Sequence, residues 1–506
     1  IYLNDADNHI IAGNYIGLDA SGSSALANGM GGIRLQNSES TRIGTDSNGS
    51  SDSSERNVVS GNSQSGIQVS GASTNNTVIA GNYIGLDSSG AADLGNSNSG
   101  VMVDSSAQNT TIGTNGDGTR DSTERNIISG NTFGGITLLD QSGTVVAGNY
   151  IGLNAAGTAA VPNGEGIWIQ SSNKAEKVVG AVRIGNDEDG TADAAEANLI
   201  SGNIGNGVRI EAGSGHTIAG NAIGLDINGA SRGNGEDGIY IAFSSTNVLI
   251  GTDGNGSNDA AGINFISGNS NYGVRIFNTG ATIAGNHIGT NAAGTAARAN
   301  GLGGVMLNGS GSIVGVNGDA SAGEANEGNL ISGNGGPGVT ISSDAGNRVA
   351  GNFIGVNDAG TAALANASHG ISILNSVAGA VIGSNNDAIS DTLEGNLISG
   401  NIAHGIRLYS ASNAINNTSI LGNTIGLNAS RESAIPNGAN GISLSGTNNT
   451  VIGLDTEALR NWISANDEDG IYLADIHTNL QITGNCIGLT ASGAAAGNGG
   501  NGIRIT

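Results

Sequence analysis

The stretches Asn126-Ile-Ile-Ser-Gly-Asn131, Gly135-Ile-Thr-Leu138 and Gly148-Asn-Tyr-Ile-Gly152 follow one another and decide the fold. Each is a short run with apolar residues two positions apart, bounded by Gly, Asn or Ser. Alternation with a period of two, with β-branched residues at the inward positions, is typical of strands. Gly, Asn and Ser between such runs are typical of turns. The stretch therefore predicts short strands joined by turns, and no helix.

The same three strings recur along the whole chain. Gly-Asn-x-Ile-Gly occurs eight times, Asn-x-(Ile/Val)-Ser-(Gly/Ala)-Asn seven times and Gly-(Ile/Val)-x-(Ile/Leu/Val) fifteen times. One such unit is too short to bury its own apolar face, whereas stacked units bury it continuously. We therefore predict an all-β parallel solenoid of about 15 coils of about 23 residues, with loop insertions that alternate between two places. Because no part of 1–506 lacks the repeats, we expect one continuous domain.

Composition excludes several classes of protein. The chain has 506 residues with 89 Gly, 3 Pro and 1 Cys, so collagen and a disulfide framework are excluded. Its 17 Lys and Arg against 42 Asp and Glu give a net charge of −25, which disfavours nucleic acid as a partner. No apolar run is long enough to span a membrane. Recurrent β-branched residues argue against disorder.

The strings Asn-Ile-Ile-Ser-Gly-Asn, Gly-Ile-x-Leu and Gly-Asn-Tyr-Ile-Gly-Leu-Asp resemble the right-handed parallel β-helix repeats of large secreted bacterial surface proteins. The fold of these proteins is similar to that of pectate lyases. The resemblance covers all 506 residues and implies a right-handed, single-stranded β-helix. Such repeats occur in enzymes, adhesins and stalks alike, so the resemblance leaves the function open.

One asparagine stands at the same place in every Asn-x-Ile unit. Stacked asparagines can bond to one another along the repeat axis, and an Asn at a turn can also bond to the backbone. We therefore expect a structural ladder rather than a ligand-binding row. Its first members are Asn14, Asn57, Asn82, Asn126, Asn149, Asn198, Asn221 and Asn264.

The second insertion is rich in acidic residues. An Asp lies eight residues after a glycine and a Glu lies eleven after it. Clustered oxygen ligands on Gly-rich loops suit Ca²⁺, although neither known Ca²⁺ loop spacing is present. The alternative is that these acids cap a short helical turn and keep the loop solvated. The candidate ligands are Asp52, Glu55, Asp121, Glu124, Asp193, Glu196, Asp391 and Glu394.

The variable residue x of Gly-Ile-x-Leu forms an outward row. Trp168, Arg209, Tyr240 and Arg275 are consecutive in it, so rings alternate with cations within cation–π reach. In pectate-lyase-like enzymes the outer face of one sheet binds the sugar, and the resemblance therefore implies a glycan platform here, with Glu211 nearby. The alternative is an ordinary sheet face, because aromatic residues favour strands.

No coil departs from the repeat in the way that a single active site requires, and Asp104 and Glu211 each stand alone in the sequence. Our first hypothesis is a non-enzymatic, extracellular structural or adhesive segment of a bacterial surface or matrix protein. The alternative is a carbohydrate-active enzyme (lyase, epimerase or hydrolase) or a glycan-binding module on the Gly-Ile-x-Leu face. Expected partners are a surface glycan or further copies end to end. The chain begins inside a coil and stops inside a strand motif, which favours a piece of a longer protein.

Overall fold

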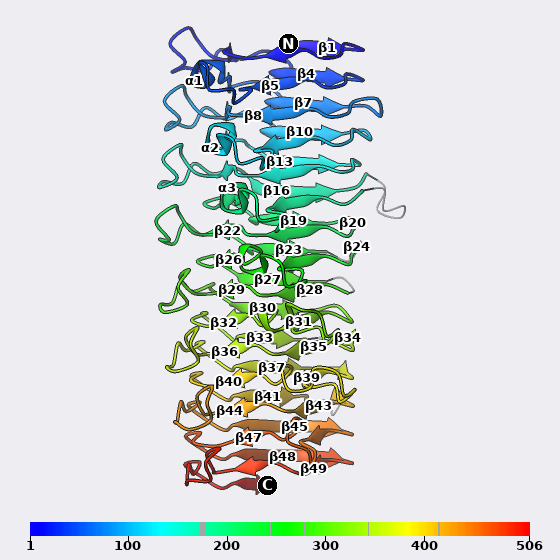
Figure 1. Cartoon of the computed structure of the whole chain (residues 1–506), viewed down its shortest axis with the longest axis vertical. Coiled ribbons are helices and arrows are strands. Elements are labelled where there is room, and N and C mark those ends of the chain that lie inside the picture. The colour runs from blue at the N-terminus through cyan, green and yellow to red at the C-terminus, as the bar shows by residue number, and fades with distance from the viewer. Residues whose placement is uncertain (173–178, 243, 278–279, 343, 413–414) are drawn as a thin grey trace. The chain divides into compact units, whose positions relative to one another are not determined.

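The computed structural model describes residues 1–172, 179–242, 244–277, 280–342, 344–412 and 415–506. The chain divides into two compact units. The first comprises Ile1–Gly251 with Gly268–Ser270, and the second comprises Thr252–Ser267 with Asn271–Thr506. Within each unit, short strands of successive coils stack into three parallel sheets, here called A, B and C, as Figure 1 shows for β4, β7 and β10.

In the first unit, the Gly-Ile motifs form sheet A. Its strands are β1 (Tyr2–Asn4), β4 (Ile33–Gln36), β7 (Ile67–Ser70), β10 (Val101–Asp104), β13 (Gly134–Leu139), β16 (Glu165–Gln170), β19 (Val208–Ile210) and β23 (Ile239–Ile241). Sheet B contains β2 (Ile10–Ile11), β5 (Arg42–Gly44), β8 (Val78–Ala80), β11 (Thr111–Gly113), β14 (Val145–Ala147), β17 (Arg183–Gly185), β21 (Thr217–Ala219) and β25 (Leu249–Gly251). The Asn-x-Ile units form sheet C, with β3 (Tyr15–Ile16), β6 (Val58–Val59), β9 (Tyr83–Ile84), β12 (Ile127–Ile128), β15 (Tyr150–Ile151), β18 (Leu199–Ile200) and β22 (Ala222–Ile223). A small pair consists of β20 (Gly213–Ser214) and β24 (Ser245–Thr246).

The second unit repeats this arrangement. Sheet A contains β27 (Tyr272–Ile276), β30 (Gly303–Leu307), β33 (Val339–Ile341), β37 (Ile371–Leu374), β41 (Ile406–Tyr409), β45 (Ile442–Asn448), β48 (Ile471–Thr478) and β51 (Ile503–Ile505), extended by β34 (Asp344–Ala345), β38 (Val377–Ala378) and β42 (Ile415–Asn416). Sheet B contains β28 (Thr282–Ala284), β31 (Ile313–Gly315), β35 (Arg348–Ala350), β39 (Val381–Gly383), β43 (Ser419–Leu421), β46 (Val451–Ile452) and β49 (Gln481–Ile482). Sheet C contains β26 (Phe265–Ile266), β29 (His287–Ile288), β32 (Leu330–Ile331), β36 (Phe353–Ile354), β40 (Leu397–Ile398), β44 (Thr424–Ile425), β47 (Trp462–Ile463) and β50 (Cys486–Ile487).

In the part of the chain that the structure describes, helices are confined to single turns in the acidic insertions. They are α1 (Asp52–Glu55), α2 (Asp121–Glu124), α3 (Asp193–Glu196) and the 3₁₀ turns η1 (Asp259–Ala261) and η2 (Glu324–Asn326). Among the described residues, no helix has the length and apolar character needed to cross a bilayer.

The Gly-Ile strands pair in register. Ile33 is opposite Ile67, which is opposite Val101, and all three side chains are fully buried. The x residues Arg34 and Gln68 therefore face outward together. The second unit shows the same register, with Val274 opposite Val305. The predicted all-β, right-handed parallel β-helix is confirmed; one continuous domain over 1–506 stays a prediction.

The asparagines bond to one another along each unit. The side-chain amide of Asn57 donates to Oδ1 of Asn82 at 3.0 Å, and Asn82 donates to Asn126 at 3.0 Å. The second amide proton of each side chain reaches a backbone carbonyl, as from Asn82 to Ile43 at 2.9 Å. Since these residues are fully buried, each bond satisfies a group that would be costly to leave unpaired.

A second asparagine ladder runs beside the first and was not predicted. It alternates the last Asn of Asn-x-Ile-Ser-Gly-Asn with an Asn at the end of the other insertion, so that Asn62 donates to Asn96, which donates to Asn131, each at 2.9 Å. In the second unit, Asn300 donates to Asn334 at 3.0 Å. The recurrence of that Asn in the motif was the available signal.

Candidate functional site

Two columns of residues vary on sheet A of each unit while the core positions stay constant. One is the outward x of Gly-Ile-x-Leu. The other, here called the pre-glycine column, is the residue immediately before the glycine of that motif. In the first unit this column reads Gly31, Ser65, Ser99, Gly134, Glu165, Asn206 and Asp237. In the second it reads Tyr272, Gly303, Pro337, His369, His404, Asn440, Asp469 and Asn501.

The predicted ring and cation strip is present in the first unit. Trp168, Arg209 and Tyr240 are direct neighbours in the register of β16, β19 and β23. Cζ of Arg209 lies 5.0 Å from the Trp168 ring centroid and 5.6 Å from that of Tyr240. Phe133, which is 44% exposed, packs on Trp168 with its ring centroid 4.9 Å away. These residues together form an aromatic surface around one guanidinium.

Two glutamates bind that guanidinium from different sides. Nη1 of Arg209 donates to Oε1 of Glu165 at 3.1 Å, while Nε and Nη2 donate to Oε1 of Glu211 at 3.0 and 2.5 Å. Burial alone would lower the pKa of Arg209, but the hydrogen bonds and charges of Glu211 and Glu165 outweigh it and raise the pKa. Arg209 is therefore a fixed cation that holds both carboxylates in place.

Two further acids adjoin this group through Asn206. The backbone N–H of Asn206 donates to Oε2 of Glu165 at 2.6 Å, and its side-chain amide donates to Oε2 of Glu236 at 2.8 Å. Its Oδ1 accepts from the backbone N–H of Asp237 at 3.1 Å. We call Glu165, Asn206, Arg209, Glu211 and Glu236, with Trp168 and Tyr240, the Arg209 cluster.

The prediction that Glu211 stands alone is wrong. Glu211 shares Arg209 with Glu165, which comes from another coil. Asp104 lies elsewhere on the face and accepts a bond of 2.6 Å from Gln68. Arg275 belongs to the second unit, where its guanidinium lies 5.0 Å from the ring of Phe277 and 5.8 Å from that of Tyr272.

A different cluster occupies the same two columns in the second unit. The imidazoles of His369 and His404 stack with ring centroids 5.1 Å apart and an interplanar angle of 2°. Nη1 of Arg407 lies 3.4 Å from Nε2 of His369, and its guanidinium lies 4.7 Å from the ring of Tyr409. We call His369, His404, Arg407 and Tyr409 the Arg407 cluster.

Both imidazoles of this cluster are neutral at pH 7. Burial lowers the pKa of His369 to about 4, aided by the charges of His404 and Arg407, and burial followed by Arg407 lowers the pKa of His404. Nδ1 of His404 accepts from the backbone N–H of Asn440 at 3.1 Å, which places its proton on Nε2. Nδ1 of His369 faces the N–H of His404 in the same way at 3.3 Å. His404 therefore presents an N–H donor at Nε2 beside a cation, whereas both ring nitrogens of His369 face donors, namely the N–H of His404 and Nη1 of Arg407.

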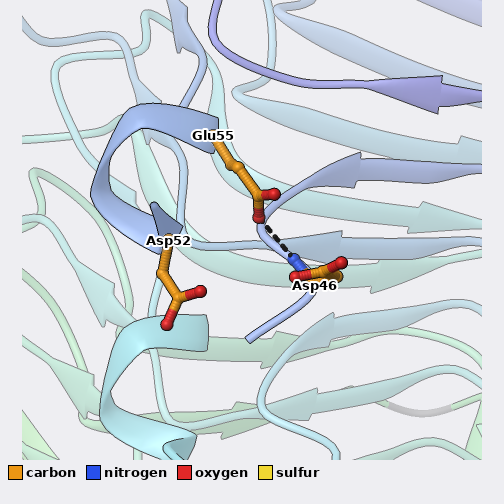
Figure 2. A group of neighbouring side chains, drawn as sticks. All are labelled: Asp46, Asp52 and Glu55. Atoms are coloured by element: carbon orange, nitrogen blue, oxygen red, sulfur yellow. Dashed lines mark hydrogen bonds between the residues drawn. The ribbon is translucent and has the colours of Figure 1, made fainter. Parts of the chain in front are cut away.

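Figure 2 shows the acidic group at the N-terminal copy of the acidic insertion, with Asp46, Asp52 and Glu55 at and near α1. One carboxylate oxygen of each lies within 4.8 Å of the others, and Oε2 of Glu55 accepts from the backbone N–H of Asp46 at 2.9 Å. Asp187, Asp189 and Asp193 form a similar group. All the candidate ligand atoms are carboxylate oxygens, which are hard ligands, so these two groups fit a Ca²⁺ ion by ligand type.

The eight candidate ligands are not brought together as one equivalent row. Glu124 and Glu394 each accept from a backbone N–H nine residues earlier, at Asn115 and Asn385, in both cases at 3.0 Å. Asp121 accepts from Thr114 at 3.0 Å and Asp391 accepts from Ser384 at 2.5 Å. Glu196 is paired with Arg183 at 2.9 Å. These carboxylates are therefore already bonded within their own loops. Arg183 would compete with a metal ion for Glu196.

The expected helix caps do not form. The residue before α1 is Ser51 in the left-handed conformation, without a side-chain cap. The acids lie inside the turn instead, and the glutamate binds the strand end rather than the helix start.

The sequence analysis missed the pre-glycine column, and with it Glu165, Asn206, His369 and His404. The column could have been recognised in the sequence, because the residue type changes from coil to coil at a fixed position before the invariant glycine of the Gly-Ile motif. Small or neutral residues occupy the column at Ser65 and Ser99, whereas acids, amides and imidazoles follow later.

No protein-family model matches the sequence, and no curated protein is similar to it. Among solved structures, the chain is similar to the periplasmic alginate epimerase AlgG, with 14% identity over 90% of this chain and 77% of the other and a TM-score of 0.38. It is similar to the A-module of the Azotobacter vinelandii mannuronan C-5 epimerase AlgE4, with 12% identity over 99% and 91% and a TM-score of 0.30. The Dettilon tailspike protein has 13% identity over 93% and 62% and a TM-score of 0.34.

These likenesses concern the fold, and they correct one expectation. We predicted a non-enzymatic structural or adhesive segment because the repeats are regular along the chain. This prediction is contradicted by the comparison, in which the similar structures include an alginate epimerase and a mannuronan C-5 epimerase. Residues in the x and pre-glycine columns differ from coil to coil in charge and side-chain type, while the buried residues of the repeat stay the same. A regular repeat can therefore carry a local functional site.

Proposed function

We propose that this chain is a carbohydrate-active β-helix that binds a polysaccharide along the Gly-Ile-x-Leu face and hydrolyses it at the Arg209 cluster. The observation that carries the proposal is the meeting of Trp168, Phe133 and Tyr240 with two carboxylates held by one guanidinium. Aromatic faces pack against the apolar faces of sugar rings, while carboxylates accept hydrogen bonds from hydroxyl groups.

Charge favours a neutral glycan at this cluster. Arg209 is the cation, and Glu165, Glu211 and Glu236 surround it directly or through Asn206. A uronate would meet this negative excess, whereas a neutral sugar offers hydroxyl protons to the same oxygens.

The chemistry assigned to the cluster is addition of water across a glycosidic bond. One carboxylic acid protonates the leaving oxygen, and a carboxylate activates water or attacks the anomeric carbon. Glu165 and Glu211, which share a cation, are suited to the carboxylate role because Arg209 stabilises their charge. We assign the proton-donor role to Glu236, whose carboxyl group is bonded to the neutral side-chain amide of Asn206 rather than to the Arg209 cation.

A second candidate function belongs to the Arg407 cluster. The Arg407 cation and the neutral imidazole of His404, which donates from Nε2, form a set of donors for a carboxylate or sulfate group. The cluster contains no acid, in contrast to the Arg209 cluster. We propose that it binds an acidic glycan without cleaving it, because both Nδ1 atoms face backbone N–H groups and are not available as bases.

The test screens neutral polysaccharides for binding and for release of reducing ends. We expect turnover with the wild-type chain and at least a 100-fold loss in Glu211→Gln and in Glu236→Gln, in line with the roughly 100- to 10,000-fold contribution of positioned acids and bases. Trp168→Ala should weaken binding. Met102→Ala, at the same x column but outside the cluster, is the matched control.

Binding that depends on Trp168 without any release of reducing ends would overturn the hydrolytic part and leave a glycan-binding module. Absence of binding to any neutral glycan would overturn the proposal as a whole. We also propose that the protein is located outside the cell or at the cell surface, where polysaccharides are accessible to it. Ca²⁺ at Asp46, Asp52 and Glu55 is a separate proposal, tested below.

A further inference from the structure

The arginines that precede the ladder asparagines fill a niche over a ring of the next coil. In the first unit, Cζ of Arg56 lies 4.1 Å from the Tyr83 ring centroid, and Nε donates to the carbonyl of Gly81 at 3.2 Å. Arg125 repeats this arrangement on Tyr150 at 4.3 Å, with its Nε bond to Gly148 at 3.1 Å. The niche has three parts: a ring, a glycine carbonyl and a guanidinium.

The second unit contains the same niche without its arginine. The bond from Asn329 to Asn352 corresponds to the bond from Asn57 to Asn82, so Gly328 stands at the place of Arg56. Phe353 then corresponds to Tyr83, and Gly351 to Gly81. A Cβ at Gly328 would lie 2.3 Å from the carbonyl oxygen of Gly351, so this backbone leaves no room for a side chain.

A pocket of about 470 Å³ opens at this place, lined by Gly328, Gly351 and Phe353 together with Asp259, His287 and Asp358. Its volume lies within the range of about 300–1,000 Å³ that is usual for small-molecule sites. All lining residues belong to the second unit. The pocket is formed by sheet C and the acidic insertions and is therefore separate from the Gly-Ile-x-Leu face.

The walls of the pocket are negative. Asp259 is 4% exposed, and its Oδ2 accepts from the amide of Asn326 at 2.9 Å. Asp358 is exposed, with its Oδ1 3.6 Å from Nε2 of His287. Other coils carry an alanine at the position of Asp358, as at Ala155 and Ala429, so this acid is particular to the pocket.

Further acidic residues interact electrostatically with one another near Asp259. Burial raises the pKa of Glu327 to about 7, and the charges of Asp319, Glu324 and Asp259 contribute to the shift. His287 is neutral at pH 7 because burial lowers its pKa. A cation bound beside these groups would relieve the repulsion among the acids.

We propose that this pocket binds a guanidinium group presented by a small molecule or by the arginine of a partner. The guanidinium would stack on Phe353 and pair with Asp358 and Asp259, as the chain's own arginines stack on Tyr83 and Tyr150. A planar cation fits a ring and carbonyl niche better than a compact ammonium, because it stacks and donates at its edge at the same time.

The experiment measures binding of ethylguanidinium to the full chain by calorimetry, with ethylammonium and glucose as comparison ligands. We expect saturable binding of ethylguanidinium, weakened at least tenfold in Phe353→Thr and in Asp358→Ala. Both replacements use residues that other coils carry, at Thr424 and Ala155. Glu457→Gln removes an exposed acid outside the pocket and should leave the affinity unchanged.

A second variant empties the niche over Tyr83, which Arg56 fills in the wild-type chain. Arg56→Ala should lose stability and gain one further ethylguanidinium site over Tyr83, and binding there should restore part of the stability. No saturable binding to the wild-type chain, or binding that both pocket variants leave unchanged, would overturn the proposal. Equal affinity for ethylammonium would overturn the stacking geometry, and so would failure of Arg56→Ala to gain a site.

Discussion

Arg209 and Arg407 occupy the same x column of Gly-Ile-x-Leu, each in its own unit, yet their surroundings differ in sign. Arg209 is bonded to Glu165 and Glu211, whereas Arg407 adjoins His369, which stacks on His404. Both arginines also contact a ring, at Trp168 and at Tyr409. The scaffold under both is the same register of buried Ile, Val and Leu. The residues around the x position, in the pre-glycine column and next to it, therefore set the charge of the site, and the repeat sets only its position.

The largest effect expected from this difference concerns catalysis. Carboxylates that can act on a glycosidic bond surround Arg209 but not Arg407, so cleavage should depend on the first cluster alone. Glu165→Gln should lower kcat for a neutral polysaccharide at least 100-fold, as loss of a positioned carboxylate generally does. His404→Asn, which keeps an acceptor for the next backbone N–H, should leave kcat unchanged. Equal losses in both variants, measured as reducing ends released, would contradict the division of roles.

The next effect concerns the scaffold that both clusters share. Asn221 is fully buried, and its amide donates to the carbonyl of Ile184 at 2.9 Å. Asn221→Ala should lower the free energy of unfolding by about 1–3 kcal/mol, because it leaves buried partners unpaired. Chemical denaturation measures this value. Asn228→Ala, in a partly exposed loop, serves as the control, and a change near zero for Asn221→Ala would show that the ladder adds little.

A pH dependence sharpens the comparison, since only one cluster contains imidazoles. The pKa of His369 is lowered to about 4 from its usual value of 6.5. Between these values the unfolded chain binds more protons than the folded chain, so stability falls as the pH decreases through this window. One group contributes at most about 1.4 kcal/mol per pH unit, and less here because His369 is only partly buried.

His369→Asn tests this effect, because Asn440 shows that an asparagine in the column accepts the same backbone bond. The variant should have a flatter stability profile from pH 6.5 to pH 4 in denaturation experiments. The raised pKa of Glu327 acts with the opposite sign, since its contribution is lost as the pH rises toward about 7. A profile unchanged by His369→Asn would remove His369 as a titrating group in this range.

The smallest effect concerns Ca²⁺. If Asp46, Asp52 and Glu55 hold an ion, added Ca²⁺ should raise the Tm by a few degrees and EDTA should reverse it, by mass action on the folded state. Asp46→Asn should lower this response without changing the Tm in EDTA by more than a surface substitution does. Arg42 and Arg120 lie 3.4 and 3.6 Å from Asp46 and Asp52 and partly neutralise them, which limits the expected gain. A Tm that is insensitive to Ca²⁺ would leave these acids as loop-closing groups.

The sequence predicted the architecture because the apolar period of two and the recurrent asparagines are local signals. Ile33, Ile67 and Val101 are inward in register, as the Gly-Ile motif indicates. The strip of Trp168, Arg209 and Tyr240 also follows from counting x positions. The meeting of Glu165 and Glu211 could not be predicted in this way. The two residues are far apart in sequence and meet only through the side chain of Arg209. The stacking of His369 on His404 required the second column to be recognised.

The central claim is that these two clusters, one in each unit, prefer glycans of different charge. The most direct test is the affinity of the chain for one oligosaccharide and for its carboxylated form, measured by calorimetry at pH 7. Trp168→Ala should weaken binding of the neutral form at least tenfold and leave the carboxylated form unchanged. Arg407→Ser, which introduces the residue found at Ser372 and Ser443, should do the reverse. If both variants weaken both ligands equally, or neither variant affects either ligand, the account is contradicted.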